Sequence, residues 1–169
     1  MNLGLIASIS GMSDHTPADD ARLISAAYIE FHVKRDAENL ALLERDTRYL
    51  AKAVGSFALF LMDAVVIPER HDVRWTDGWV EVDFRRRTDP QFRATLGRRD
   101  QYRRQALGRT LRPRAVLRRT AREVTSMLCL AYTVEHGRNT DADVPEAVSL
   151  MLDTFRRRYC HSSDGKRNA

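Results

Sequence analysis

Arginine is the residue type in this sequence that could do the most chemistry, and it is concentrated in one segment. Residues 85–122 contain 14 arginines against only two acidic residues, Asp89 and Asp100, so the segment has a net charge of +12. The preceding residues 1–84 have a net charge of −6, and residues 123–169 have a net charge of −1. Guanidinium groups pair with phosphate through two parallel hydrogen bonds, so this segment predicts a surface for a polyanion.

Three arginine clusters within this segment are the candidate contacts, and the first forms a regular ridge. Arg114, Arg118 and Arg122 recur every four residues, which on a helix places them on one side about 6 Å apart, a spacing that phosphates along a strand can meet. Tyr102 lies among the arginines and could stack on an unpaired base, with a place in the core as its alternative. The full set of predicted nucleic-acid contacts is Arg85, Arg86, Arg87, Arg98, Arg99, Arg103, Arg104, Arg114, Arg118 and Arg122.

Genome composition and pairing within the fold could also account for the arginines. Arginines make up 25 of the 28 basic residues, and a GC-rich genome would raise arginine content everywhere, but it would not by itself segregate the charge. The arginines could instead pair with the acidic first half inside the fold, or dock on an acidic protein or a membrane surface. Against internal pairing, like charges at i,i+4 repel by some tenths of a kcal/mol, and an external polyanion would relieve that repulsion.

Nothing in the sequence indicates catalysis or a bound cofactor. We find no nucleotide-binding glycine motif, no metalloprotease motif and no serine-hydrolase motif. The candidate metal ligands Cys129, His136, Cys160 and His161 lack the close paired spacing of a structural zinc site. We therefore expect a protein that is not an enzyme, with no metal and no cofactor.

Cysteine usage and hydropathy predict a cytoplasmic protein. Two separated cysteines do not suggest a disulfide scaffold. Residues 1–11 are mildly apolar but lack the basic start of a signal peptide. The apolar run from Phe57 to Ile67 is interrupted by Asp63 and is too short to span a bilayer. We expect no contact with a membrane.

The hydrophobic periodicity predicts a mainly α protein, a bundle of about five helices with one small β-hairpin at about 71–84. We expect a flexible N-terminal segment at 1–15, a single helical domain at 16–161 that includes the arginine-rich middle at 85–122, and a disordered tail at 162–169.

Helix boundaries in the first half follow from capping residues, glycine and proline. Thr16 and Pro17 begin a helix that runs to about residue 53 or breaks near Asp36. Gly55 marks a boundary, and a buried helix then covers Ser56 to Val66 and ends before Pro68.

The hairpin is predicted from an Asp77-Gly78 turn. This turn would pair Trp75 with Val80 and Val73 with Val82, placing these apolar side chains on one face. Trp79 would fall on the other face and could contact a partner.

The second half predicts three more helices. One begins at Thr88-Asp89-Pro90 and ends near Gly108; a long one runs from Pro113 to about Glu135 and ends at Gly137; the last begins at Asp143. The inward side of the long helix is formed by Leu117, Thr120, Val124, Met127, Leu128 and Ala131, and that of the last helix by Val148, Met151, Leu152 and Phe155.

The overall plan, about 170 residues in a helical bundle with a basic face and no catalytic motif, resembles the small helical subunit of multisubunit (class 1) CRISPR effector complexes. The resemblance is architectural and rests on no motif. It implies a protein that stacks along the RNA-bound backbone of larger subunits and stabilises RNA or displaced single-stranded DNA without cleaving it. The hairpin is not expected in that family.

Two further functions fit the same sequence. One is a dimeric DNA-binding regulator or plasmid-maintenance protein, and the other is an adaptor that docks on an acidic protein. The outward residues are mainly arginine rather than the varied side chains that read base edges, which favours contacts with the phosphate backbone. We therefore expect partners that include RNA or single-stranded DNA, together with other subunits or further copies of the chain.

Overall fold

The computed structural model describes residues 17–73, 79–137 and 144–160, and this part of the chain is helical, with no strand. The predicted helical bundle is therefore confirmed. The predicted segments 1–15 and 162–169 lie outside the described residues. The helices are α2 (Pro17–Lys34), α3 (Ala37–Leu43), α4 (Thr47–Leu61), α5 (Ile67–His71), α6 (Trp79–Thr88), α7 (Pro90–Ala106), α8 (Pro113–His136) and α9 (Val144–Cys160), with a 3-10 turn at Glu44–Asp46 and a π-helical turn at Met62–Val66.

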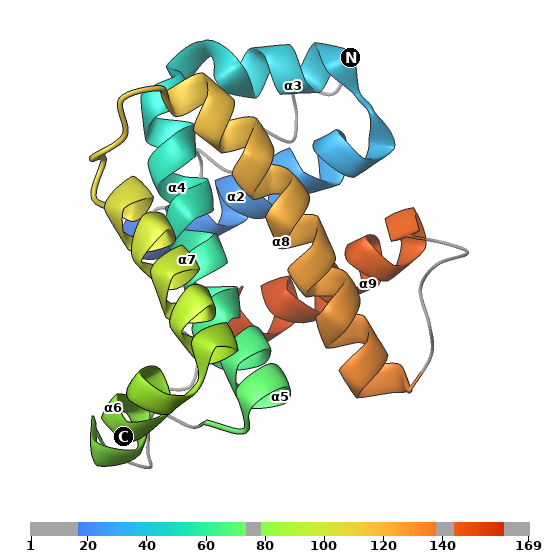
Figure 1. Cartoon of the computed structure of the whole chain (residues 1–169). Helices are drawn as coiled ribbons and strands as arrows, with labels where there is room; N and C mark the ends of the chain where they lie inside the picture. The colour runs from blue at the N-terminus through green and yellow to red at the C-terminus, as the bar shows by residue number, and fades with distance from the viewer. Residues whose placement is uncertain (1–16, 74–78, 138–143, 161–169) are drawn as a thin grey trace, which may run out of the picture.

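Helix α4 is the centre of the bundle. It packs against α2, α7 and α8, while α9 closes the core against α2 and α8 (Figure 1). The side chains of Val54, Phe57 and Ala58 on α4 are fully buried, and Leu117, Val124 and Leu128 on α8 meet them in one hydrophobic cluster. This packing holds α7 and α8, which carry nine of the 14 arginines of residues 85–122, on one side of α4.

The continuous helical run Ala37–His71 is long and apolar enough to cross a membrane by length and composition. The sequence prediction rests only on the shorter apolar segment from Phe57 to Ile67, which is too short to do so. Of the apolar window in that run, 61% is buried inside the bundle. The contacts of α4 with three other helices therefore account for its hydropathy.

Several predicted boundaries agree with the structure. Of the two predicted alternatives for the first helix, the break near Asp36 is the one observed, since Arg35 adopts a φ of 55° and the Asp36 side chain then caps α3 by accepting a hydrogen bond from the Asn39 backbone N–H. Asp89 caps α7 in the same way, and Gly137, with a φ of 62°, ends α8. The six predicted inward residues of α8 are all buried, as are Val148 and Leu152 of α9, whereas Met151 and Phe155 are partly buried against the core.

Two predicted boundaries are wrong, because neither Gly55 nor Pro68 ends a helix. Gly55 lies within α4 and is buried. Pro68 is accommodated because the preceding turn is π-helical, with the Ile67 backbone N–H bonded to the Met62 carbonyl. This wider turn avoids the clash that a proline ring makes with the carbonyl four residues before it.

The predicted hairpin at 71–84 is also corrected, because its second strand is helical. Residues 74–78, including Trp75 and the Asp77-Gly78 turn, lie outside the described residues, but Trp79–Thr88 forms α6. Val82 packs into the core while α6 lies on α7, and an ion pair between Arg87 and Asp83 at 2.8 Å supports the helical turn. Packing on α7 and this i,i+4 ion pair favour a helix here, and they outweigh the short alternation of apolar residues that predicts a strand.

Candidate nucleic-acid interface

The C-terminal end of α7 determines where several arginines point. Gly108 adopts a φ of 72°, the Arg109 N–H donates to the Arg104 carbonyl at 2.9 Å, and the Gly108 N–H donates to the Gln105 carbonyl at 3.0 Å. These two bonds define a Schellman motif, which ends the helix and turns the chain back beside it. Such a motif usually brings together two apolar side chains, those of the third-last helical residue and of the second residue after the cap. Here these two positions are Arg104 and Arg109.

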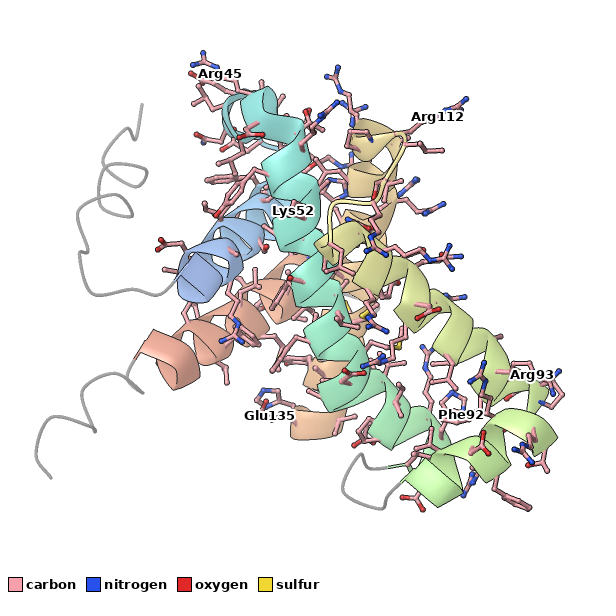
Figure 2. The ribbon with its side chains drawn as sticks, turned by 90° about the vertical axis from the view of Figure 1, so that its left-hand side faces the viewer. Arg45, Lys52, Phe92, Arg93, Arg112 and Glu135 are labelled. Carbon is pink, nitrogen blue, oxygen red and sulfur yellow. The ribbon has the colours of Figure 1, made fainter. Side chains whose placement is uncertain are left out.

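A groove between the last turns of α7 and the first turns of α8 collects these arginines, and we call it the arginine groove. Its volume is about 360 Å³. Arg104, Arg109, Arg112 and Arg119 line it, and all four are exposed. Within the part of the chain that the structure describes, none of the four forms an ion pair with an acidic side chain. Nitrogen-tipped side chains stand outward along this side of the molecule, from Arg112 at one end to Arg93 at the other (Figure 2).

The base of the groove is held by buried polar side chains. The Gln105 side-chain amide donates to the Ala51 carbonyl of α4 at 2.8 Å and accepts a hydrogen bond from the Thr120 hydroxyl of α8 at 2.8 Å. Gln105 therefore joins α7 to both α4 and α8, which fixes the positions from which the arginines project.

Tyr102 lies in the core rather than on the surface. Its side chain is 2% exposed, and its hydroxyl donates to the Glu123 carboxylate at 2.6 Å. Burial, together with this hydrogen bond, raises the pKa of Tyr102 well above its ordinary value of 10.0. A ring buried to this extent could stack on a base only if α7 moved away from α8.

The predicted ridge of Arg114, Arg118 and Arg122 forms on the exposed side of α8, but it is partly neutralised. The Glu44 carboxylate lies 3.7 Å from Arg114 and 3.6 Å from Arg118, and it also accepts a hydrogen bond from the Tyr28 hydroxyl at 2.9 Å. Both ion pairs are long, and their arginine side chains are 70% and 56% exposed, so solvent weakens them even though the Glu44 side chain is only 11% exposed.

The second predicted cluster divides between structure and surface. Arg99 donates to both oxygens of Asp63, at 2.6 and 2.9 Å, which ties α7 to the π-helical turn. This hydrogen bonding raises the pKa of Arg99 further above its usual value. Arg98, Arg103 and Arg104 are exposed. Arg103 lines a separate cavity between α6 and α7.

The third predicted cluster, Arg85 to Arg87, lies on α6 and not in a loop. Arg85 donates to the His71 carbonyl at 3.2 Å, Arg87 pairs with Asp83, and Arg86 is exposed beside the cavity between α6 and α7. The structure thus places the three predicted clusters on different elements and does not bring them into one site.

The sequence reasoning missed four arginines that the structure makes prominent. Arg109, Arg112 and Arg119 line the arginine groove, while Arg93 donates to the carbonyls of Arg86 and Arg87 and thereby closes the end of α6. The signal for the groove lies in the sequence, because Gly108 directly follows a helix that ends in arginines and predicts a return of the chain past Arg104.

We searched the described residues for a metal site and compared the chain with known proteins. Within residues 17–73, 79–137 and 144–160, no three histidine, cysteine or carboxylate side chains come together as a potential metal site. Cys129 is partly buried, and His161 lies outside the described residues. Comparison with protein-family models, with curated proteins and with solved structures gave no match.

Proposed function

We propose that this protein binds the sugar–phosphate backbone of nucleic acid through the arginine groove and the adjoining ridge on α8, and that it is not an enzyme. The observation that carries the proposal is the pair of arginines in the Schellman motif, where apolar side chains usually meet. Bringing two like charges together costs free energy in the unbound protein, and an anion between them would recover it. Arg112 and Arg119 add two more cations to the same groove.

The side chains of the groove favour the backbone over base edges as the ligand. Discrimination between bases uses varied hydrogen-bonding side chains such as asparagine, glutamine and glutamate. The polar side chains at the base of this groove, Gln105 and Thr120, are buried and already bonded to each other and to α4. Gln101 and Thr110 also line the groove, and Gln101 is exposed, but most of the exposed donors are the guanidinium groups of the four arginines, which are suited to phosphate.

A subunit that lies along RNA or single-stranded DNA in a larger ribonucleoprotein fits these properties, and the resemblance to the small subunit of CRISPR effector complexes implies such a role. A role of this kind needs a basic surface on a rigid helical support and no catalytic group. Binding to any sequence is then expected, because the larger assembly would set the position of the protein along the strand.

The test is binding of the full chain to labelled single-stranded RNA, single-stranded DNA and duplex DNA of arbitrary sequence, measured by fluorescence anisotropy between about 50 and 200 mM salt. For single strands the slope of log K against log salt is about −0.7 for each phosphate neutralised, so the four arginines of the groove alone contribute about −2.8, and contacts of the ridge on α8 add to this. The double variant R104Q/R119Q should reduce that slope by about 1.4. A matched control is R70Q/R157Q, which removes the same charge from exposed arginines outside the groove.

Each result separates one candidate function from the rest. An equal loss in the two double variants would mean that net charge, and not the groove, governs binding. A salt-resistant preference for one duplex sequence, with a symmetric dimer, would favour the regulator. Absence of binding to any nucleic acid at low salt would overturn the proposal and favour an acidic protein as the partner.

A further inference from the structure

A leucine stands fully in solvent beside the arginine groove. The loop between α7 and α8 is short, closed on one side by the Schellman motif at Gly108 and on the other by Pro113 in the first turn of α8. Within it Leu111 is 100% exposed, and Leu107, the C-cap residue of α7 just before it, is 56% exposed. A leucine in this position gains none of the stabilisation that burial provides, so the fold itself gives no reason for an apolar side chain there.

Leu111 is flanked by cations on both sides. Arg109 and Arg112 precede and follow it in the loop, and Arg104 and Arg119 face the same groove from the two helices. Leu111, Val116 and the buried Tyr102 provide the apolar part of the lining. The site thus combines positive charges with an apolar wall, and a volume of about 360 Å³ is at the lower end of the range for small-molecule pockets.

We infer that the arginine groove holds one unpaired, unstacked nucleotide of a single strand, and this inference rests on the proposed function. The base lies against Leu111 and Val116, and its flanking phosphates lie on the four arginines. A nucleotide in a single strand has this combination, an apolar face within a short distance of two negative charges. Leucine is among the apolar side chains that proteins insert against partly unstacked bases. Every base has such a face, so no sequence preference follows.

Duplex nucleic acid does not fit this site equally well. In a duplex the faces of the bases are covered by their neighbours, and only their edges reach the grooves. Leu111 would then remain in water or would have to separate a base step, which costs free energy. The inference therefore specifies single-stranded nucleic acid as the ligand class, which the charge of the groove alone does not.

The test compares two oligomers of equal length and charge, oligo-dT and the same chain in which every position is abasic. Wild-type protein should bind oligo-dT about tenfold more tightly, since contact with a base removes Leu111 from water. Leu111→Ala should lose most of this preference while keeping the salt slope, and it should fold normally because the side chain is fully exposed. Leu150→Ala on α9, where the leucine is 40% exposed, is the matched control and should behave as wild type.

A second readout follows the base directly. A 2-aminopurine placed in the oligo-dT strand brightens when it leaves the stack, and we expect this increase with wild type and Leu150→Ala but not with Leu111→Ala. Equal, salt-dependent binding of both oligomers would overturn the inference and leave the backbone-binding proposal intact. Absence of binding to either oligomer would overturn the backbone-binding proposal itself.

Discussion

Substitution of Gly55 by alanine tests whether close contact between α4 and α7 holds the arginine groove in place. A Cβ atom at Gly55 would lie 2.8 Å from the Gln105 Cγ, 2.9 Å from the Gln105 Cβ and 2.9 Å from the Ala106 backbone N. One of these atoms belongs to the backbone of α7, so a change of side-chain rotamer cannot remove the clash. Helix α7 would have to move away from α4.

The expected cost is the balance of two destabilising effects and one stabilising effect. Overpacking a core contact costs about 1–3 kcal/mol. Displacement of Gln105 also strains its buried hydrogen bonds to Ala51 and Thr120, and an unsatisfied buried polar group costs about 1–3 kcal/mol. Replacement of a helical glycine by alanine returns up to about 1 kcal/mol. We expect Gly55→Ala to lower the free energy of unfolding by about 2 kcal/mol, which for a chain of this size lowers Tm by about 4–8 °C.

Gly97 provides the control, because the same substitution there lacks the clash. Gly97 lies within α7, and a Cβ atom at this position meets nothing within 4 Å. Gly97→Ala should therefore raise the free energy of unfolding by up to about 1 kcal/mol. Thermal and urea unfolding monitored by circular dichroism measure both variants. If Gly55→Ala is as stable as wild type or more so, the close approach of α7 does not constrain the bundle, and the reasoning fails.

Two further predictions concern the ridge on α8, where Glu44 lies near the arginines, and the dependence of stability on pH. Glu44→Gln removes the acid near Arg114 and Arg118, so it should tighten binding to single-stranded RNA about two- to fivefold at low salt by anisotropy; weaker binding would contradict a role for this ridge. Burial lowers the pKa of His32 and His71 below the ordinary 6.5, so the folded protein binds fewer protons than the unfolded chain as pH falls, and the free energy of unfolding should decrease below about pH 6.5. Urea unfolding at about pH 7.5 and about pH 5.5 measures this decrease in the free energy of unfolding. The decrease should be much smaller in the double variant His32→Gln/His71→Gln than in wild type; an equal decrease in both would assign the pH dependence to other groups.

Helix ends in this chain could be predicted where a single local signal dominates, as at Asp36, Asp89 and Gly137. Each acts through its own backbone or side chain, so no distant contact is needed to recognise it. Gly55 and Pro68 misled the prediction because their effects depend on context. Gly55 serves a close helix contact with Gln105, which is 50 positions away in the sequence, and a π-helical turn accommodates Pro68.

The arginines show the same limit at the level of the site. The four-residue spacing of Arg114, Arg118 and Arg122 correctly predicts a ridge, because spacing on one helix is a local property. The neutralising Glu44 comes from a turn before α4, about 70 residues earlier, and only the packing of the bundle reveals it. Arg99 likewise looks like its neighbours in the sequence but binds Asp63 of the π-helical turn.

Net charge therefore overestimates the surface available to a polyanion and also misplaces it. Arg87 and Arg99 already have carboxylate partners, so counterion release from these two would be small. Arg104, Arg109, Arg112 and Arg119 have no such partner among the described residues, and a rigid chain reversal holds them around one groove. Fixing like charges near each other raises the free energy of the unbound protein. The slope of affinity against salt should therefore follow these four residues and the exposed ridge on α8 rather than the total of 14 in the segment.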